Sequence, residues 1–192
     1  MNRIIIGITG ASGSVYAKRL IEELSGAGHD VHVICSKTGD EVFSYETGIS
    51  PEDFIRTLGG SPKAPVIHQN DNLFAPPASG SFKADAMVIV PASMATLGGI
   101  AAGSLQSLLG RSADVCLKER RKLIIVPRET PFSRIHLRNM LELTETGAVI
   151  LPAMPGFYNH PKTVDDIVNF TVARILDQLG IENTLTKRWE GR

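Results

Sequence analysis

Short β-branched runs that alternate with segments of helical periodicity constrain this chain more than any other feature. Residues 4–8 form such a run and end at a glycine-rich turn, after which apolar residues return every three or four positions as far as residue 24. Strands that alternate with helices pair in parallel and are covered on both faces. The pattern predicts an α/β fold, a doubly wound, mostly parallel sheet of five or six strands that is flavodoxin-like or Rossmann-like. The other apolar runs lie at residues 31–35, 87–90, 123–126 and 148–151.

A single domain over residues 1–192 is predicted, because no internal repeat or low-complexity tract divides the sequence. A chain of 192 residues can bury roughly 70% of its extended surface, enough for a core without disulfide or metal. Residues 60–83 are rich in proline and glycine and are expected to be irregular, apart from a short extended piece near Val66. The last helix is predicted from an apolar stripe between Val164 and Leu179, with Phe170 on its outer face as a second packing surface for subunit contacts.

The charge balance disfavours two classes of partner. Twenty Lys and Arg equal 20 Asp and Glu, so the chain as a whole is attracted neither to nucleic acid nor to an anionic membrane.

The first residues lack the apolar stretch of a signal peptide, and no apolar run approaches the ~20 residues of a membrane span. Cys35 and Cys116 fit no disulfide or metal spacing and are interpreted as buried free thiols. The sequence therefore predicts a cytoplasmic protein.

Small and hydroxyl-bearing residues follow three of the predicted strands. Parallel sheets bind ligands beyond the carboxyl ends of their strands, where N–H groups at helix starts hold phosphate. Each serine by itself is more simply a helix N-cap, but three at one sheet edge favour a nucleotide. The glycine turn is not a complete GxGxxG and no acid follows the second strand, so a mononucleotide flavin fits better than NAD. These residues are Gly10, Ala11, Ser12, Ser36, Ser93, Met94, Ala95 and Thr96.

Cations gather in one segment of this neutral chain. Residues 111–138 hold eight Lys or Arg against three acids. Arg111 and Lys118 are seven apart and share a helical face, and the pair Arg128 and Glu129 follows a predicted strand between two prolines. The excess is either a solvated surface of ion pairs or a second anion site beside the nucleotide, because guanidinium and ammonium groups suit phosphate.

A stiff loop follows the last predicted strand. Residues 152–161 contain three prolines and two aromatics, which either pack locally or form an apolar wall with the Tyr158 phenol at its tip. Arg174, at the edge of the last apolar stripe, points either to solvent or toward an anion. The five histidines show no ligand spacing, and Asp165 and Asp166 lack a second acidic pair, so no metal is predicted.

Five sequence blocks together resemble the UbiX-like flavin prenyltransferases. The resemblance covers nearly the whole chain, and the LKERR and RETP stretches are its most specific parts. It implies a flavodoxin-like fold, FMN as the cofactor, and large homo-oligomers, typically dodecamers, with sites shared between subunits. Ala95 and Ser107 depart from the Lys or Gly and the Asn that many members carry there. The blocks are residues 7–13, 91–96, 111–121, 128–131 and 155–158.

The resemblance also implies a reaction. A dimethylallyl group would pass from dimethylallyl monophosphate to N5 and C6 of reduced FMN, and the prenylated FMN would serve a UbiD-type decarboxylase, in ubiquinone biosynthesis or aromatic acid decarboxylation. Arg and Lys can stabilise a monophosphate leaving group without a metal, and Ser12 and Glu129 are suited to move protons. The expected catalytic residues are Ser12, Glu129 and Lys118. FMN would be held by Gly10, Ala11, Ser12, Ser36, Ser93, Met94, Ala95, Thr96 and Arg128, and the allyl phosphate by Arg111, Lys118, Glu129, Tyr158 and Arg174.

Three other functions stay open at this point. An FMN-dependent cysteine decarboxylase shares the fold, but the active-site His expected near its first helix is missing. A non-catalytic phosphate-binding module would use the serine turns only as caps, and such a protein would fail to take up FMN. A short-chain dehydrogenase is suggested by the Thr9 turn, but Tyr16 is followed four residues later by Leu20 and not by the Lys which that class requires.

Overall fold

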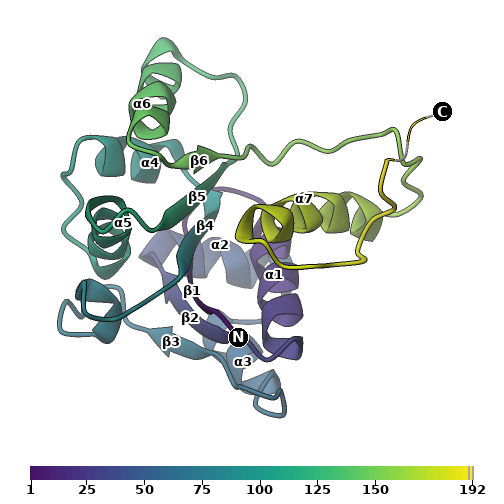
Figure 1. Cartoon of the computed structure of the whole chain (residues 1–192), viewed down its shortest axis with the longest axis horizontal. Helices are drawn as coiled ribbons and strands as arrows, with labels where there is room; N and C mark the ends of the chain where they lie inside the picture. Colours follow the sequence, from purple (N-terminus) through teal and green to yellow (C-terminus); the bar gives the residue numbers. More distant parts are fainter. Residues whose placement is uncertain (190, 192) are drawn as a thin grey trace.

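One six-stranded sheet lies between two layers of helices in the computed structural model, which describes residues 1–189 and 191 (Figure 1). The strand order is β3-β2-β1-β4-β5-β6, and every neighbouring pair is parallel. The predicted doubly wound, Rossmann-like sheet is confirmed, and it is entirely parallel. The order reverses between β1 and β4, which marks the place where such sheets bind ligands. The strands are β1 (Arg3–Ile8), β2 (Asp30–Cys35), β3 (Val66–His68), β4 (Ala86–Ala92), β5 (Lys122–Pro127) and β6 (Val149–Ile150).

The helices divide between the two faces of the sheet as the crossovers require (Figure 1). Helices α1, α2, α3 and α7 cover one face, and α4, α5 and α6 cover the other. Their bounds are α1 (Ser14–Gly26), α2 (Lys37–Thr47), α3 (Pro51–Thr57), α4 (Met94–Ala101), α5 (Leu108–Lys118), α6 (Arg134–Glu145) and α7 (Val164–Leu179), with a short 3-10 helix, η1 (Pro76–Ala78), before β4.

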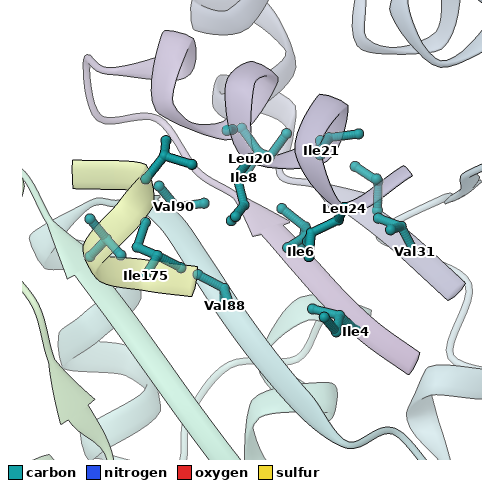
Figure 2. Close-up of a cluster of buried hydrophobic side chains, with 14 of the residues drawn as sticks. Ile4, Ile6, Ile8, Leu20, Ile21, Leu24, Val31, Val88, Val90 and Ile175 are labelled. Atoms are coloured by element: carbon teal, nitrogen blue, oxygen red, sulfur yellow. The ribbon is translucent and has the colours of Figure 1, made fainter. Parts of the chain in front are cut away.

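The central strands have two buried faces, which explains their continuous apolar sequences. In β1, Ile4, Ile6 and Ile8 join the core beneath α1 and α7, and Figure 2 shows them beside Ile175 and the apolar side chains of α1. Ile5 points to the opposite side and joins the core beneath α4, α5 and α6. The strand therefore contributes to both cores and anchors the middle of the sheet.

Strand β4 continues two residues beyond its predicted end and contains Pro91. Proline has no N–H for the sheet, and the register with β5 shifts between Ile89 and Ala92. The Pro91 carbonyl instead accepts hydrogen bonds from the N–H of Thr9 at 3.2 Å and from its hydroxyl at 2.8 Å. The irregularity thus joins the end of β4 to the end of β1.

Some sequence predictions need correction at the level of single side chains. Val164 was predicted in the apolar stripe of the last helix, but it is 72% exposed because it lies in the first turn of α7, at the outer end of the helix. Phe170 does lie on a second packing surface, where Tyr158 of the chain's own loop packs edge to face on its ring, and its role in subunit contacts stays a prediction. Cys116 is buried as predicted, whereas Cys35 is only partly buried. Burial raises the pKa of the Cys35 thiol to about 12 and that of Cys116 to about 11.

Residues 60–83 form loops around β3 and η1, as predicted. None of the helices within residues 1–189 combines the length and the apolar character needed to cross a bilayer.

A substitution in α2 tests how closely that helix approaches β1. A Cβ on Gly39 would lie 2.4 Å from the Ile8 carbonyl oxygen, so Gly39→Ala is expected to lower the free energy of unfolding by about 1–3 kcal/mol in chemical denaturation. Gly26→Ala is the control, because a Cβ there meets nothing within 4 Å, and its stability should be unchanged or slightly higher. Equal stability of the two variants would contradict the close packing.

Candidate functional site

The ends of β1, β4 and β5 meet at the carboxyl edge of the sheet. The Thr9 hydroxyl, which is fully buried, accepts a hydrogen bond from the N–H of Ser93 at 2.7 Å. The N–H of Arg128 donates to the Ala92 carbonyl at 3.3 Å, and its Nε donates to the Ser12 carbonyl at 3.1 Å. The Ser36 N–H, after β2, donates to the Ile8 carbonyl at 2.9 Å. Four strand ends are therefore joined into one surface, which we call the loop-tip site: residues 9–13, 36, 93–96, 128 and 129.

The serine side chains of the loop-tip site differ in the hydrogen bonds that they make. Ser36 accepts a hydrogen bond from the Gly39 N–H at 3.0 Å, and Ser93 accepts one from the Thr96 N–H at 3.2 Å, so both cap helices. Ser12 does not cap α1, whose N-cap is Gly13 and carries no side-chain hydrogen bond. The helix-capping interpretation therefore holds for two serines, and the exposed Ser12 hydroxyl is left for another role.

Glu46 on α2 replaces the missing cap, and sequence reasoning missed it. Its carboxylate accepts hydrogen bonds from the Gly13 N–H at 2.9 Å and from the Ser14 N–H at 2.7 Å, and the Ser12 side chain lies close enough to help lower its pKa. Partial burial raises the pKa of Glu46, but these hydrogen bonds outweigh it and hold the pKa below its usual value. A negative charge here also interacts favourably with the N-terminal end of α1. Glu46 therefore fixes the first turn and gives Ser12 a proton acceptor.

Small residues let the first turn pack closely on its neighbours. A Cβ on Gly10 would lie 2.5 Å from the Thr38 side chain of α2. Ala11 and Met94 are buried beneath the surface, whereas Ala95 is exposed on it. Ser12 and Ala95 are therefore the exposed members of this part of the site.

Arg128 and Glu129 border this surface directly after β5. Arg128 is exposed, and its guanidinium binds the backbone of the first turn. Glu129 is half-buried and accepts a hydrogen bond from the Thr130 N–H at 2.9 Å. The pair thus adds one cation and one carboxylate to the loop-tip site.

Two predicted phosphate-binding cations lie on α5. Arg111, in the first turns, donates to the Ala78 carbonyl at 3.1 Å and pairs with Asp114 at 2.6 Å. Lys118, at the end of α5, pairs with Glu119 at 2.5 Å. It lies beside the start of β5, whose six residues at about 3.3 Å each place roughly 20 Å between Lys118 and the end of that strand. One chain therefore does not bring Lys118 to the loop-tip site.

Tyr158 and Arg174 belong to a different part of the molecule. We call residues 151–163 and 181–189 the C-terminal arm, which extends beside α7 away from the sheet (Figure 1). Tyr158 packs edge to face on Phe170 and Trp189, with ring centroids 5.8 and 5.7 Å away. Arg174 pairs with Asp177 on α7 at 2.9 Å. Of the predicted substrate residues, Glu129 therefore lies in the loop-tip site, whereas Tyr158 and Arg174 form groups on the C-terminal arm and α7.

Among the residues that the structure describes, no three His, Cys, Asp or Glu side chains come together in a way that could hold a metal ion.

Comparison with known proteins defines the family. A family model described as Flavoprotein matches residues 1–176. Flavin prenyltransferase UbiX of Halalkalibacterium halodurans is 50% identical over 188 residues, which cover 96% of this chain and 91% of the relative. The UbiX of Methanocaldococcus jannaschii is 50% identical over 187 residues, with 97% and 98% covered. The chain belongs to the UbiX flavin prenyltransferase family.

Solved UbiX structures share the fold over its whole length. AnUbiX (PadA1), in complex with FMN and dimethylallyl pyrophosphate, superposes with a TM-score of 0.93 at 40% identity and covers 100% of this chain and 98% of its own. A dodecameric FMN-dependent UbiX-like decarboxylase from Escherichia coli O157:H7 gives 0.91 at 44% identity, with 98% and 100% covered. The cysteine decarboxylase TvaF gives 0.62 at 19% identity, which shows a shared fold alone.

The loop-tip site of this UbiX-family chain has the donors that FMN requires. Hydroxyls, the N–H groups at the start of α4 and the Arg128 guanidinium suit a phosphate monoester. Ala95 is exposed at this surface and adds only a methyl group. The residues present therefore fit the group.

Removing the Glu46 carboxylate tests the first turn. Glu46→Ala leaves the Gly13 and Ser14 N–H groups without an acceptor, so FMN affinity should fall about tenfold or more in a flavin fluorescence titration. Glu46→Gln keeps an acceptor oxygen and should lose less. Glu41→Ala, on the exposed side of α2, is the control and should bind FMN normally. Normal FMN binding by Glu46→Ala would show that other contacts hold the turn.

Proposed function

We propose that this protein is a flavin prenyltransferase that transfers a dimethylallyl group from dimethylallyl monophosphate to N5 and C6 of reduced FMN. The observation that carries the proposal is the junction of Ser12, Ser93 and Arg128 in one site, in a chain that is 50% identical to UbiX enzymes over nearly its full length. Reduced FMN, when bound, supplies the electron-rich N5 and C6 that accept the allyl group.

Binding of FMN is assigned to the loop-tip site. The N–H groups that follow β4 and the Arg128 guanidinium offer the phosphate both hydrogen bonds and positive charge. The full proposed set is Gly10, Ala11, Ser12, Ser36, Ser93, Met94, Ala95, Thr96 and Arg128.

Proton transfer is assigned to two carboxylates and a hydroxyl. The Glu46 carboxylate lies beside the Ser12 side chain, so a proton that reaches the Ser12 hydroxyl can pass on to that carboxylate. Glu129, half-buried beside Arg128, serves as the acid-base group near the leaving phosphate. Both groups lie at the edge of the sheet where FMN is expected.

Activation of the allyl phosphate is assigned to side chains from neighbouring copies. Lys118 lies roughly 20 Å from the end of β5, so it reaches a loop-tip site only across a subunit boundary. The cations stabilise the charge that builds on the leaving phosphate without a metal, and the apolar wall around Tyr158 excludes water. The proposed residues are Arg111, Lys118, Tyr158 and Arg174, together with Glu129 of the loop-tip site itself.

The wider setting follows from the same assignment. We propose that residues 1–192 form one domain. The chain assembles into a homo-oligomer, a dodecamer, and acts in the cytoplasm. A dodecameric relative at 44% identity supports the assembly. The prenylated FMN passes to a UbiD-type decarboxylase, and neither nucleic acid nor a membrane is involved.

The decisive experiment is anaerobic incubation of the protein with reduced FMN and dimethylallyl monophosphate. Mass spectrometry of the released flavin should show the gain of one prenyl unit. Glu129→Gln is the matched variant, and it should bind FMN but form this product at least tenfold more slowly. Flavin of unchanged mass from the unsubstituted protein would refute the proposed function.

Mixing inactive variants tests the shared site. Ser12→Ala and Lys118→Ala should each lose activity, whereas hetero-oligomers assembled from both chains should regain part of it, because some sites then combine an intact Ser12 with an intact Lys118. The prenylation rate is measured after co-expression and compared with each variant alone. No recovery in mixed assemblies would show that both residues act from the same chain.

A further inference from the structure

One carboxylate on α7 binds two guanidinium groups. Asp177 accepts hydrogen bonds from both terminal nitrogens of Arg188, at 2.6 and 2.7 Å, and from Arg174 at 2.9 Å. Asn183 adds a fourth bond at 3.2 Å. The Asp177 side chain is only 19% exposed, so this arrangement is more than a contact between mobile surface groups.

The pair between Asp177 and Arg188 also holds the end of the C-terminal arm. Trp189, the next residue, packs edge to face on Tyr158 with centroids 5.7 Å apart. On the other side of Arg188, the Lys187 carbonyl accepts a hydrogen bond from the Asn159 side chain at 3.0 Å. Residues 187–189 therefore contact the side chains of Tyr158 and Asn159, and the Asp177 carboxylate fixes where they lie.

We propose that Asp177 is a positioning residue for the phosphate end of the allyl substrate. It orients Arg174 directly, and it orients Tyr158 through residues 187–189. The inference rests on the proposed function, because it assigns Arg174 and Tyr158 to the substrate.

Charge and geometry favour this role. An arginine presents five N–H donors, so Arg174 can bind Asp177 through one nitrogen and keep other donors for a phosphate. Two guanidinium groups share one carboxylate, which leaves one net positive charge for an anion. A guanidinium that is already ordered loses less rotamer freedom when the ligand binds. Asp177 therefore acts on substrate affinity and not on bond formation.

The first test is a kinetic comparison in the full-length, FMN-loaded enzyme. Asp177→Asn should raise the KM for dimethylallyl monophosphate about tenfold, change kcat less than threefold and leave FMN affinity unchanged. Asp165→Asn, in the exposed first turn of the same helix, is the control and should match the unsubstituted enzyme. An unchanged KM in an active Asp177→Asn enzyme overturns the proposal, and so does an equal loss of FMN affinity.

The second test does not depend on activity. Trp189 is the single tryptophan of the chain, so its emission reports directly on the C-terminal arm. Asp177→Asn should shift this emission to longer wavelength and make it more accessible to acrylamide, because the tail separates from Tyr158. Unchanged emission overturns the proposal even if the protein proves to have another activity, whereas failure of the unsubstituted protein to prenylate FMN refutes only the proposed function and its substrate assignment.

Variants of Arg188 keep the proposal testable if Asp177→Asn does not fold. Arg188→Ala removes the paired hydrogen bonds from a half-exposed position and should reproduce both the rise in KM and the emission change. Arg188→Lys keeps the charge and should restore part of each, since an ammonium group retains the ion pair without its two-pronged geometry. An Arg188→Ala enzyme with normal KM and emission overturns the proposal.

Discussion

The buried hydroxyl of Thr9 holds together the two strand ends on which the site depends. It donates to the Pro91 carbonyl at 2.8 Å and accepts from the Ser93 N–H at 2.7 Å, so its hydrogen-bonding capacity is used at the point where the strand order reverses. A buried donor or acceptor left unmatched there would cost about 1–3 kcal/mol. The bond fixes the starts of α1 and α4 relative to each other, and every loop-tip contact is built on that spacing.

The first helix of this sheet departs from the usual dinucleotide arrangement in one physical respect. In Rossmann folds the N-terminus of that helix holds a ligand's phosphate, but here the Gly13 and Ser14 N–H groups are bound to the Glu46 carboxylate. A phosphate in the same place would meet a like charge. We therefore expect the FMN phosphate near α4 and Arg128, and the ring beside Ser12. The incomplete glycine fingerprint is consistent with this difference.

Local patterns in the sequence predicted the elements but not the contacts between them. Each central strand was recognisable because two buried faces demand a continuous apolar run, as in residues 4–8. Glu46 gave no signal, because its role arises from α2 packing against a turn 33 residues earlier. The role of Asp177 could not be predicted either, because its partner Arg188 lies on a tail without periodicity. Val164 fitted the helical period yet is exposed, because periodicity does not reveal where the neighbouring surface ends.

The cation-rich segment, residues 111–138, was interpreted either as a solvated surface of ion pairs or as a second anion site. Both interpretations can hold at once. Arg111 and Lys118 are paired with neighbouring acids on the surface, as a solvated helix face requires. Exposed pairs of this kind are worth only about 0–1 kcal/mol, so a more highly charged phosphate can displace the carboxylates at little cost. Within one chain both cations are paired with acids, and Lys118 is distant from the FMN edge. In the proposed function, a second copy's cations at that edge turn this ordinary surface into an anion site.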